Sequence, residues 1–113
     1  IMKNFDTNFV IDKLIQQVNS NNGTRLSMTL LKPYVNTDSR VQQFVMDSLS
    51  DEKFASSAAF ALSELNDAQS LHNLENKYHY SHSIIEKNNI ILTLKLNQNE
   101  LAKTVLQQLK EEK

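Results

Sequence analysis

The sequence predicts an all-α domain of about seven antiparallel helices stacked as pairs, and three observations support this. Segments that resemble helix ends close on Asn36, Asn66 and Asn97, at intervals of 30 and 31 residues (66 − 36 and 97 − 66). Such a period is typical of stacked helical pairs. The 113 residues include one Gly and one Pro, too few turn formers for a sheet fold of this size. With 40% hydrophobic and 22% charged residues, residues 1–113 suit a single globular domain.

A leading helix is expected over residues 6–19, because its apolar residues recur at helical spacing. Its predicted inward residues are Phe9, Val10, Leu14, Ile15 and Val18. Segment 20–23 has linker composition and predicts a surface turn, with Thr24 as N-cap of the next helix.

The first pair is expected over about residues 24–49. Pro33 lies inside its first helix and removes a backbone donor, so a bend or an early end is predicted there. Thr37 and Asp38 begin the second helix. The inward residues expected in this pair are Leu26, Leu30, Leu31, Tyr34, Val41, Phe44, Val45 and Leu49.

The second pair is expected over about residues 52–79. Ser50 supplies an N-cap hydroxyl, followed by two acids that suit the positive end of the helix dipole, and Asp67 caps the second helix. The Ala-rich stretch 55–61 allows a neighbouring helix to approach closely. The expected inward residues are Phe54, Ala58, Ala61, Leu62, Leu65, Leu71, Leu74 and Tyr78.

The third pair is expected over about residues 83–112. Ser83 and Glu86 have capping-box spacing, which favours a helix although residues 91–96 partly alternate like a strand. The expected inward residues are Ile85, Ile91, Leu92, Leu96, Leu101, Ala102, Val105, Leu106 and Leu109.

The last two pairs align at an offset of 31 residues. In this alignment the equivalent residues are Phe54 and Ile85, Ala61 and Leu92, Leu65 and Leu96, Leu71 and Ala102, Leu74 and Val105, and Tyr78 and Leu109. The Asn at each turn is predicted to close its helix in the left-handed conformation, a position usually given to Gly.

Residues 51–71, DEKFASSAAFALSELNDAQSL, resemble a HEAT repeat, more narrowly the short bacterial repeats called PBS-lyase HEAT-like repeats. Asn66-Asp67 stands where that family has Gly-Asp, and the usual Pro after the turn is missing. The resemblance covers about residues 51–109 and specifies a fold without catalytic residues. It implies an α-α superhelix, a HEAT-like solenoid, that serves mostly as a scaffold for binding other proteins.

Charge and composition exclude several classes of function. The net charge is −1, from 12 Lys and Arg against 13 Asp and Glu, and no basic stripe suggests a nucleic-acid partner. No apolar run is long enough to insert in a membrane. The chain has no Cys, which leaves the compartment open; we expect a soluble protein and favour the cytoplasm.

In a solenoid of the HEAT kind the second helix of each pair lines the concave side, which predicts a partner-binding surface there. Its residues are Gln42, Gln43, Asp47, His72, Asn73, Lys77, Lys103, Thr104 and Gln108. This surface is polar and nearly neutral, so it suits a protein or peptide partner held by hydrogen bonds. The alternative is that these are ordinary solvated faces.

One cluster, His72, Glu75, His79 and His82, could suggest a metal site. His72 and His79 lie seven residues apart, about 10 Å at the helical rise, which is far for a shared ion, so only His79 and His82, near a helix end, could share one. We expect no metal and no cofactor. No phosphate loop, nucleophile turn or carboxylate pair is present, so the chain is predicted not to be an enzyme.

The sequence is compatible with three hypotheses about function. The favoured one is a non-catalytic protein-interaction module. The alternative is an accessory or terminal helical domain of a larger enzyme, and a chromophore lyase ranks last, because many proteins share the repeat without that activity. The leading helix lacks a fully polar outer face, so we expect the natural chain to continue upstream.

Overall fold

Helices make up the architecture of residues 3–20 and 25–111, the parts of the chain that the computed structural model describes. The elements are α1 (Lys3–Asn19), α2 (Arg25–Thr29), η1 (Lys32–Tyr34), α3 (Ser39–Asp47), η2 (Ser48–Ser50), α4 (Ala55–Ala61), α5 (Ala68–Tyr80), α6 (Ile84–Leu96) and α7 (Glu100–Glu111). The all-α prediction with seven helices is confirmed over these residues. The expected turn at 21–23 and the Thr24 cap lie outside them.

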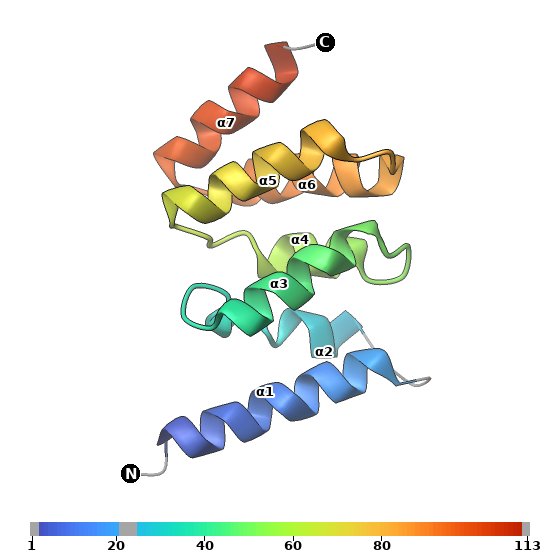
Figure 1. Cartoon of the computed structure of the whole chain (residues 1–113), viewed down its shortest axis with the longest axis vertical. Helices are drawn as coiled ribbons and strands as arrows, with labels where there is room; N and C mark the ends of the chain where they lie inside the picture. Colours follow the sequence, from blue (N-terminus) through green and yellow to red (C-terminus); the bar gives the residue numbers. More distant parts are fainter. Residues whose placement is uncertain (1–2, 21–24, 112–113) are drawn as a thin grey trace.

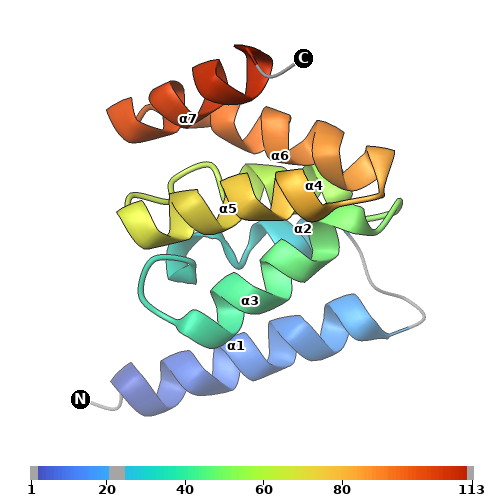
Figure 2. The same ribbon diagram turned by 45° about the horizontal axis from the view of Figure 1, so that its top comes forward.

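The helices succeed one another along the longest axis of a body measuring 47 × 32 × 19 Å, with α1 at one end and α7 at the other (Figure 1). In this view α1, α3, α5 and α7 run in one direction, and the helices between them return in the other. Figure 2 shows the same order after rotation. Within the described residues, no helix combines the length and apolar character that a membrane span requires.

Helix α4 occupies the middle of the core, where it packs against α2, α6 and η2. Its residues Ala58, Ala59 and Ala61 are fully buried, so α4 contributes only methyl groups to its contacts at these positions. The predicted close approach at this Ala-rich stretch is confirmed. All five inward residues predicted around α4, from Phe54 to Leu65, are buried.

The inward faces of α3, α5 and α7 follow the predicted pattern. Their fully buried side chains are Val41, Val45, Leu71, Leu74, Ala102, Val105 and Leu109. Phe44, Tyr78, Leu101 and Leu106 pack against these at the edge of the core. These helices are amphipathic, so helical spacing identifies a single apolar face in each.

The predicted face of α1 is wrong in part, because Phe9 and Val10 are exposed and Ile11 is buried with Leu14 and Val18. Three of these, Ile11, Leu14 and Val18, follow the i, i+3, i+7 spacing of one helical stripe. Phe9 and Val10 precede that stripe in the sequence and form exposed apolar surface outside it.

The predicted face of α2 is also wrong in part: Leu26 and Leu30 are 65% and 48% exposed, whereas Leu31 is buried and Tyr34 packs against the core, as predicted. The break that Pro33 predicts is present: the α-helix ends at Thr29, and Pro33 lies in a 3₁₀ turn that begins at Lys32. The predicted inward residues assumed a single helix that continues to Tyr34. The shorter helix buries Met28, and Leu31 and Val35 are buried in the segment that follows it.

Helix α6 buries Ile90, Thr93, Leu94 and, just beyond its end, Asn97. The predicted inward residues Ile85 and Leu96 are exposed, and Ile91 and Leu92 are half-buried. Apolar residues occur on all sides of this helix, so their spacing does not single out one face. The predicted helical state of residues 91–96 is confirmed.

The offset of 31 residues holds for α5 and α7 but not for α4 and α6. Leu71 and Leu74 match the buried Ala102 and Val105 at 31. Leu65 is buried whereas Leu96 is 42% exposed, so that equivalence is wrong. The buried counterpart of Leu65 is Asn97, 32 residues later, and its side chain bonds the Leu65 carbonyl.

Three of the predicted helix caps are present. Asp38 caps α3, Asp67 caps α5, and Ser83 caps α6, where its hydroxyl accepts a hydrogen bond from the Glu86 N–H. The capping box is incomplete, because the Ser83 N–H donates to the Ser81 hydroxyl rather than to Glu86. The predicted Ser50 cap is wrong: Phe54 is the N-cap of α4, without a side-chain bond.

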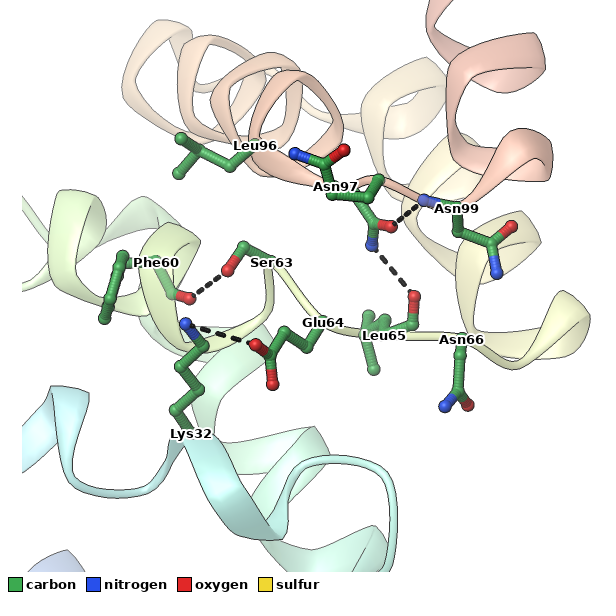
Figure 3. A pocket seen from close by; sticks show the side chains of 10 residues that line it. Lys32, Phe60, Ser63, Glu64, Leu65, Asn66, Leu96, Asn97 and Asn99 are labelled. Atoms are coloured by element: carbon green, nitrogen blue, oxygen red, sulfur yellow. Dashed lines mark hydrogen bonds and ion pairs between the residues drawn. The ribbon is translucent and has the colours of Figure 1, made fainter.

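The turn asparagines do not adopt the left-handed conformation, since no described residue has a positive φ. The side chains of Asn36 and Asn97 instead bond the backbone of the turn at residues 64–66, and Asn66 takes part through its backbone N–H. Asn36 donates to the Glu64 carbonyl over 2.7 Å and accepts from the Asn66 N–H over 3.2 Å. Asn97 donates to the Leu65 carbonyl over 2.8 Å and accepts from the Asn99 N–H over 2.8 Å (Figure 3). Their recurrence therefore reflects contacts between pairs.

Candidate functional site

Helices α3 and α5 run in the same direction (Figure 1), and residues of both line a groove between them. Two hollows of about 570 and 390 Å³ lie along it and share Asn73 in their lining. The first lies at the N-terminal ends of both helices and the second near their C-terminal ends. We refer to the two hollows together as the α3–α5 groove.

The first hollow is lined by the caps of the two helices. Asp38 accepts from the N–H groups of Arg40 and Val41, and Asp67 accepts from the N–H and hydroxyl of Ser70. The Ser70 hydroxyl, and then its N–H, stabilises the carboxylate and holds the pKa of Asp67 below its ordinary value.

The Ser70 hydroxyl also lies 3.0 Å from the Gln42 side-chain oxygen and so joins the two helices. The Gln42 amide nitrogen donates to the Val35 carbonyl over 3.0 Å. Both polar atoms of the Gln42 amide therefore have partners within the fold. Gln42 fixes the floor of the groove at this end.

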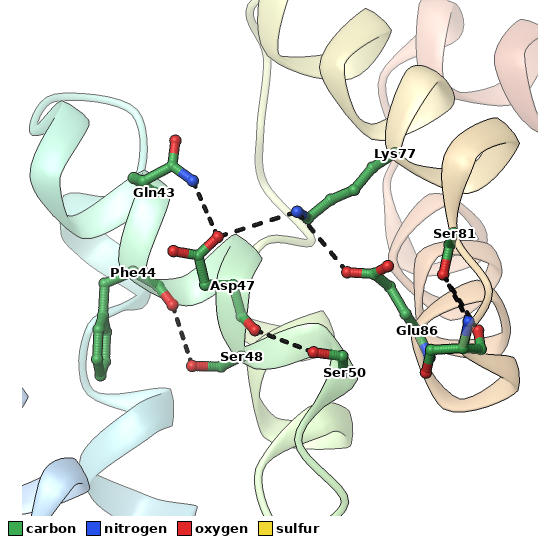
Figure 4. A network of polar contacts seen from close by, with 9 residues as sticks. Gln43, Phe44, Asp47, Ser48, Ser50, Lys77, Ser81 and Glu86 are labelled. Atoms are coloured by element: carbon green, nitrogen blue, oxygen red, sulfur yellow. Dashed lines mark hydrogen bonds and ion pairs between the residues drawn. The ribbon is translucent and has the colours of Figure 1, made fainter.

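Lys77 joins three helices beside the second hollow (Figure 4). Its ammonium lies 3.9 Å from the Asp47 carboxylate of α3 and 3.7 Å from the Glu86 carboxylate of α6. Gln43 donates to the same Asp47 oxygen over 2.9 Å. Because one ammonium lies between two carboxylates, this end of the groove keeps one negative charge in excess.

The remaining lining of the second hollow combines amides with an aromatic edge. Asn73 and Asn76 are exposed, Met46 is buried, and Tyr80 is 82% exposed. Exposed Tyr beside polar groups is favoured at binding hot spots, because its ring provides apolar contact and its hydroxyl a hydrogen bond. The groove therefore offers hydrogen-bonding groups along its length and an aromatic group at one end.

The structure brings together only part of the predicted binding surface. Gln42, Gln43, Asn73 and Lys77 line the groove, and Asp47 contacts it through Lys77. The other predicted residues lie outside this lining: His72 contacts Glu75, Lys103 and Thr104 contact Glu100, and Gln108 is exposed on α7.

The predicted concave surface did not include Asn76, Tyr80 or Glu86. The first two follow Asn73 by three and seven residues, so helical spacing on α5 could have identified them. Glu86 belongs to α6, a first helix of a pair, and no pattern in the sequence indicated that it reaches the groove.

A further hollow, of about 610 Å³, lies beside the turn between α4 and α5 (Figure 3). The Lys32 ammonium lies 4.0 Å from the centre of the Phe60 ring and 3.6 Å from the Glu64 carboxylate. Leu96 and Asn97 line its other side. This hollow mixes apolar and amide groups without an excess of either charge.

The histidines of the sequence-level cluster do not meet as a group. His72 Nδ1 lies 3.2 Å from Glu75 Oε1, and the rings of His79 and Tyr78 meet edge to face at 6.3 Å. In residues 3–20 and 25–111, no set of three or more His, Asp or Glu side chains is arranged to hold a metal ion.

No protein-family model matches the chain, and neither a curated protein nor a solved structure matches it. The resemblance to the short HEAT-like repeats therefore stays a prediction from the residues quoted above. What is established is an all-helical domain whose described residues form seven α-helices.

Proposed function

We propose that this chain is a protein-interaction module built as a short HEAT-like solenoid, and that its α3–α5 groove holds an extended segment of a partner protein. The single observation behind the binding role is the groove itself. Two parallel helices are joined across it by the Gln42–Ser70 and Asp47–Lys77 contacts, which leaves polar hollows on either side of Asn73.

The solenoid part of the proposal is supported by contacts that repeat between pairs. Asn36 and Asn97 both bond backbone groups of the turn 64–66, from opposite sides. The buried residues of α5 and α7 recur at a constant offset. Such nearest-neighbour contacts are the basis of stability in repeat proteins.

An extended peptide is the ligand best matched by these groups. Side-chain amides such as those of Asn73 and Asn76 both donate and accept, as backbone peptide groups do. The groove is open along its length, unlike the enclosed pockets that bury small molecules. Tyr80 adds an apolar contact at one end.

Selection from a random peptide library displayed on phage tests the proposal directly. Peptides that bind should lose affinity when Asn73 is changed to Ala, by about two- to tenfold for a lost hydrogen bond. Asn88→Ala, an exposed Asn on α6, is the matched control and should leave binding unchanged. Enrichment of no peptide, or equal losses in the two variants, would contradict this function.

A further inference from the structure

We propose, resting on the function proposed above, that the α3–α5 groove selects peptides with two basic residues about four or five positions apart. The inference comes from the charges along the groove and from the distance between them. Neither follows from the near-neutral charge of the whole chain.

The described residues that line the groove carry three carboxylates, Asp38, Asp67 and Glu86, and one ammonium, Lys77. Asp47 adds a fourth carboxylate beside Lys77. The guanidinium of Arg40 lies 2.6 Å from Asp12 and 3.7 Å from Asp38, so this cation too is placed between two acids.

The excess negative charge therefore lies at both ends of the groove. At one end Asp67 is bonded by Ser70, a neutral residue, and Arg40 balances only one of its two acids. At the other end Lys77 balances only one of Asp47 and Glu86. A basic side chain arriving at either end completes an ion pair without removing an existing one.

The spacing follows from helix α5, which extends between the two ends. Asp67 and Lys77 are ten residues apart (77 − 67), which is about 15 Å at the rise of an α-helix. An extended peptide covers about 3.3 Å per residue, so four or five of its residues span this distance. Asn73 and Asn76 lie between these two residues on α5 and line the groove, where their amides can bond the intervening peptide groups of the ligand.

Three pools of fluorescein-labelled nine-residue peptides test this, each with randomised neutral residues elsewhere. One pool has Arg at positions 2 and 6, the second has Arg at positions 4 and 5, and the third has Gln at positions 2 and 6. Fluorescence anisotropy should show that the spaced pool binds about threefold or more tighter than the adjacent pool and about tenfold tighter than the Gln pool. The advantage should shrink as salt is added.

Two variants locate the interaction. Asp67→Asn keeps a residue that caps helices well, and Glu86→Gln keeps the shape of the side chain. Each should weaken binding of the spaced pool about two- to fivefold. Glu111→Gln, which removes the same charge at the far end of α7, is the matched control and should have no effect.

The outcomes separate this inference from the function on which it rests. If the Gln pool binds as tightly as the spaced pool and Asn73→Ala weakens both, the groove binds peptides without charge selection, and this inference alone is overturned. If the adjacent and spaced Arg pools bind equally, the proposed spacing is wrong. If Glu111→Gln weakens binding of the spaced pool as much as Asp67→Asn does, the proposed location in the groove is wrong. Binding by no pool overturns both proposals.

Discussion

Asn97 is a buried polar residue whose side chain joins two helical pairs. It is 4% exposed, and its amide donates to the Leu65 carbonyl and accepts from the Asn99 N–H. Asn97→Ala leaves the buried Leu65 carbonyl and the half-buried Asn99 N–H without their partner, and we expect it to lower the free energy of unfolding by about 1–3 kcal/mol.

Urea unfolding followed by circular dichroism measures that loss. Asn88→Ala, an exposed change on the neighbouring helix α6, should alter the free energy of unfolding by no more than about 0.5 kcal/mol. Equal effects of the two changes would mean that the Asn97 contacts do not stabilise the fold.

We expect Asp67 to contribute to the pH dependence of the free energy of unfolding. Ser70 lowers its pKa in the folded state from 3.8, so its contribution is present above that value and is lost as the pH falls through the lower folded-state pKa. In Asp67→Asn the free energy of unfolding should therefore fall less than in the parent between about pH 5 and about pH 2.

Urea titrations at several pH values give this difference. Because Asn caps helices about as well as Asp, the two proteins should be similar in stability near neutral pH. A parallel loss in both proteins on acidification would show that Asp67 does not contribute to it.

At the scale of elements, α4 depends on the small size of its buried residues. Ala58 is fully buried where α4 packs between α2 and α6. Ala58→Leu inserts three carbon atoms between packed helices, and we expect it to lower the free energy of unfolding by about 1–3 kcal/mol.

Ser56→Leu tests the size effect on the exposed side of the same helix. It adds a side chain of the same kind without overpacking, so the free energy of unfolding should change by no more than about 0.5 kcal/mol. If Ala58→Leu changed the free energy of unfolding as little as Ser56→Leu, the core around α4 would accept a larger side chain without overpacking, which would contradict this prediction.

The elements that the sequence predicts well are those whose signals are local. Asp38, Asp67 and Ser83 cap their helices through their own side chains, and Pro33 ends an α-helix through its own ring. The inward faces of α1, α2 and α6 were predicted less well. Phe9, Leu26 and Leu96 are apolar but exposed, and only the positions of neighbouring helices decide which side of such a helix is covered.

The candidate site was predictable only in part for a related reason. Asn73 and Lys77 lie on one outward face of α5 and follow from helical spacing. Glu86 reaches the groove from another pair, and the contact of Asn97 with Leu65 depends on how two pairs pack. In the sequence, Glu86 has the position of a capping-box residue and Asn97 that of a turn residue. Neither position indicates a contact with another helical pair.

For the molecule as a whole, the order of helices predicts a gradient of local stability. Helix α4 contacts α2, α3, α6 and both 3₁₀ turns, whereas α1 packs mainly on α2. Amide hydrogens of α4 and α6 should therefore exchange at least about tenfold more slowly than those of α1, because opening α1 disrupts fewer contacts.

Hydrogen exchange followed by mass spectrometry of peptic fragments measures this difference. Helix α7 should exchange at an intermediate rate, since it packs on both α5 and α6. Uniform exchange in all seven described helices would instead indicate a single opening event of the whole domain.

The connection at residues 64–66 is tied to both neighbouring pairs, through Asn36 on one side and Asn97 on the other. Surface connections usually tolerate added sequence, yet this one has three successive backbone groups engaged. An epitope tag placed between Leu65 and Asn66 would pull those groups apart on both sides at once. Differences in length between this protein and its evolutionary relatives should accordingly fall at other loops.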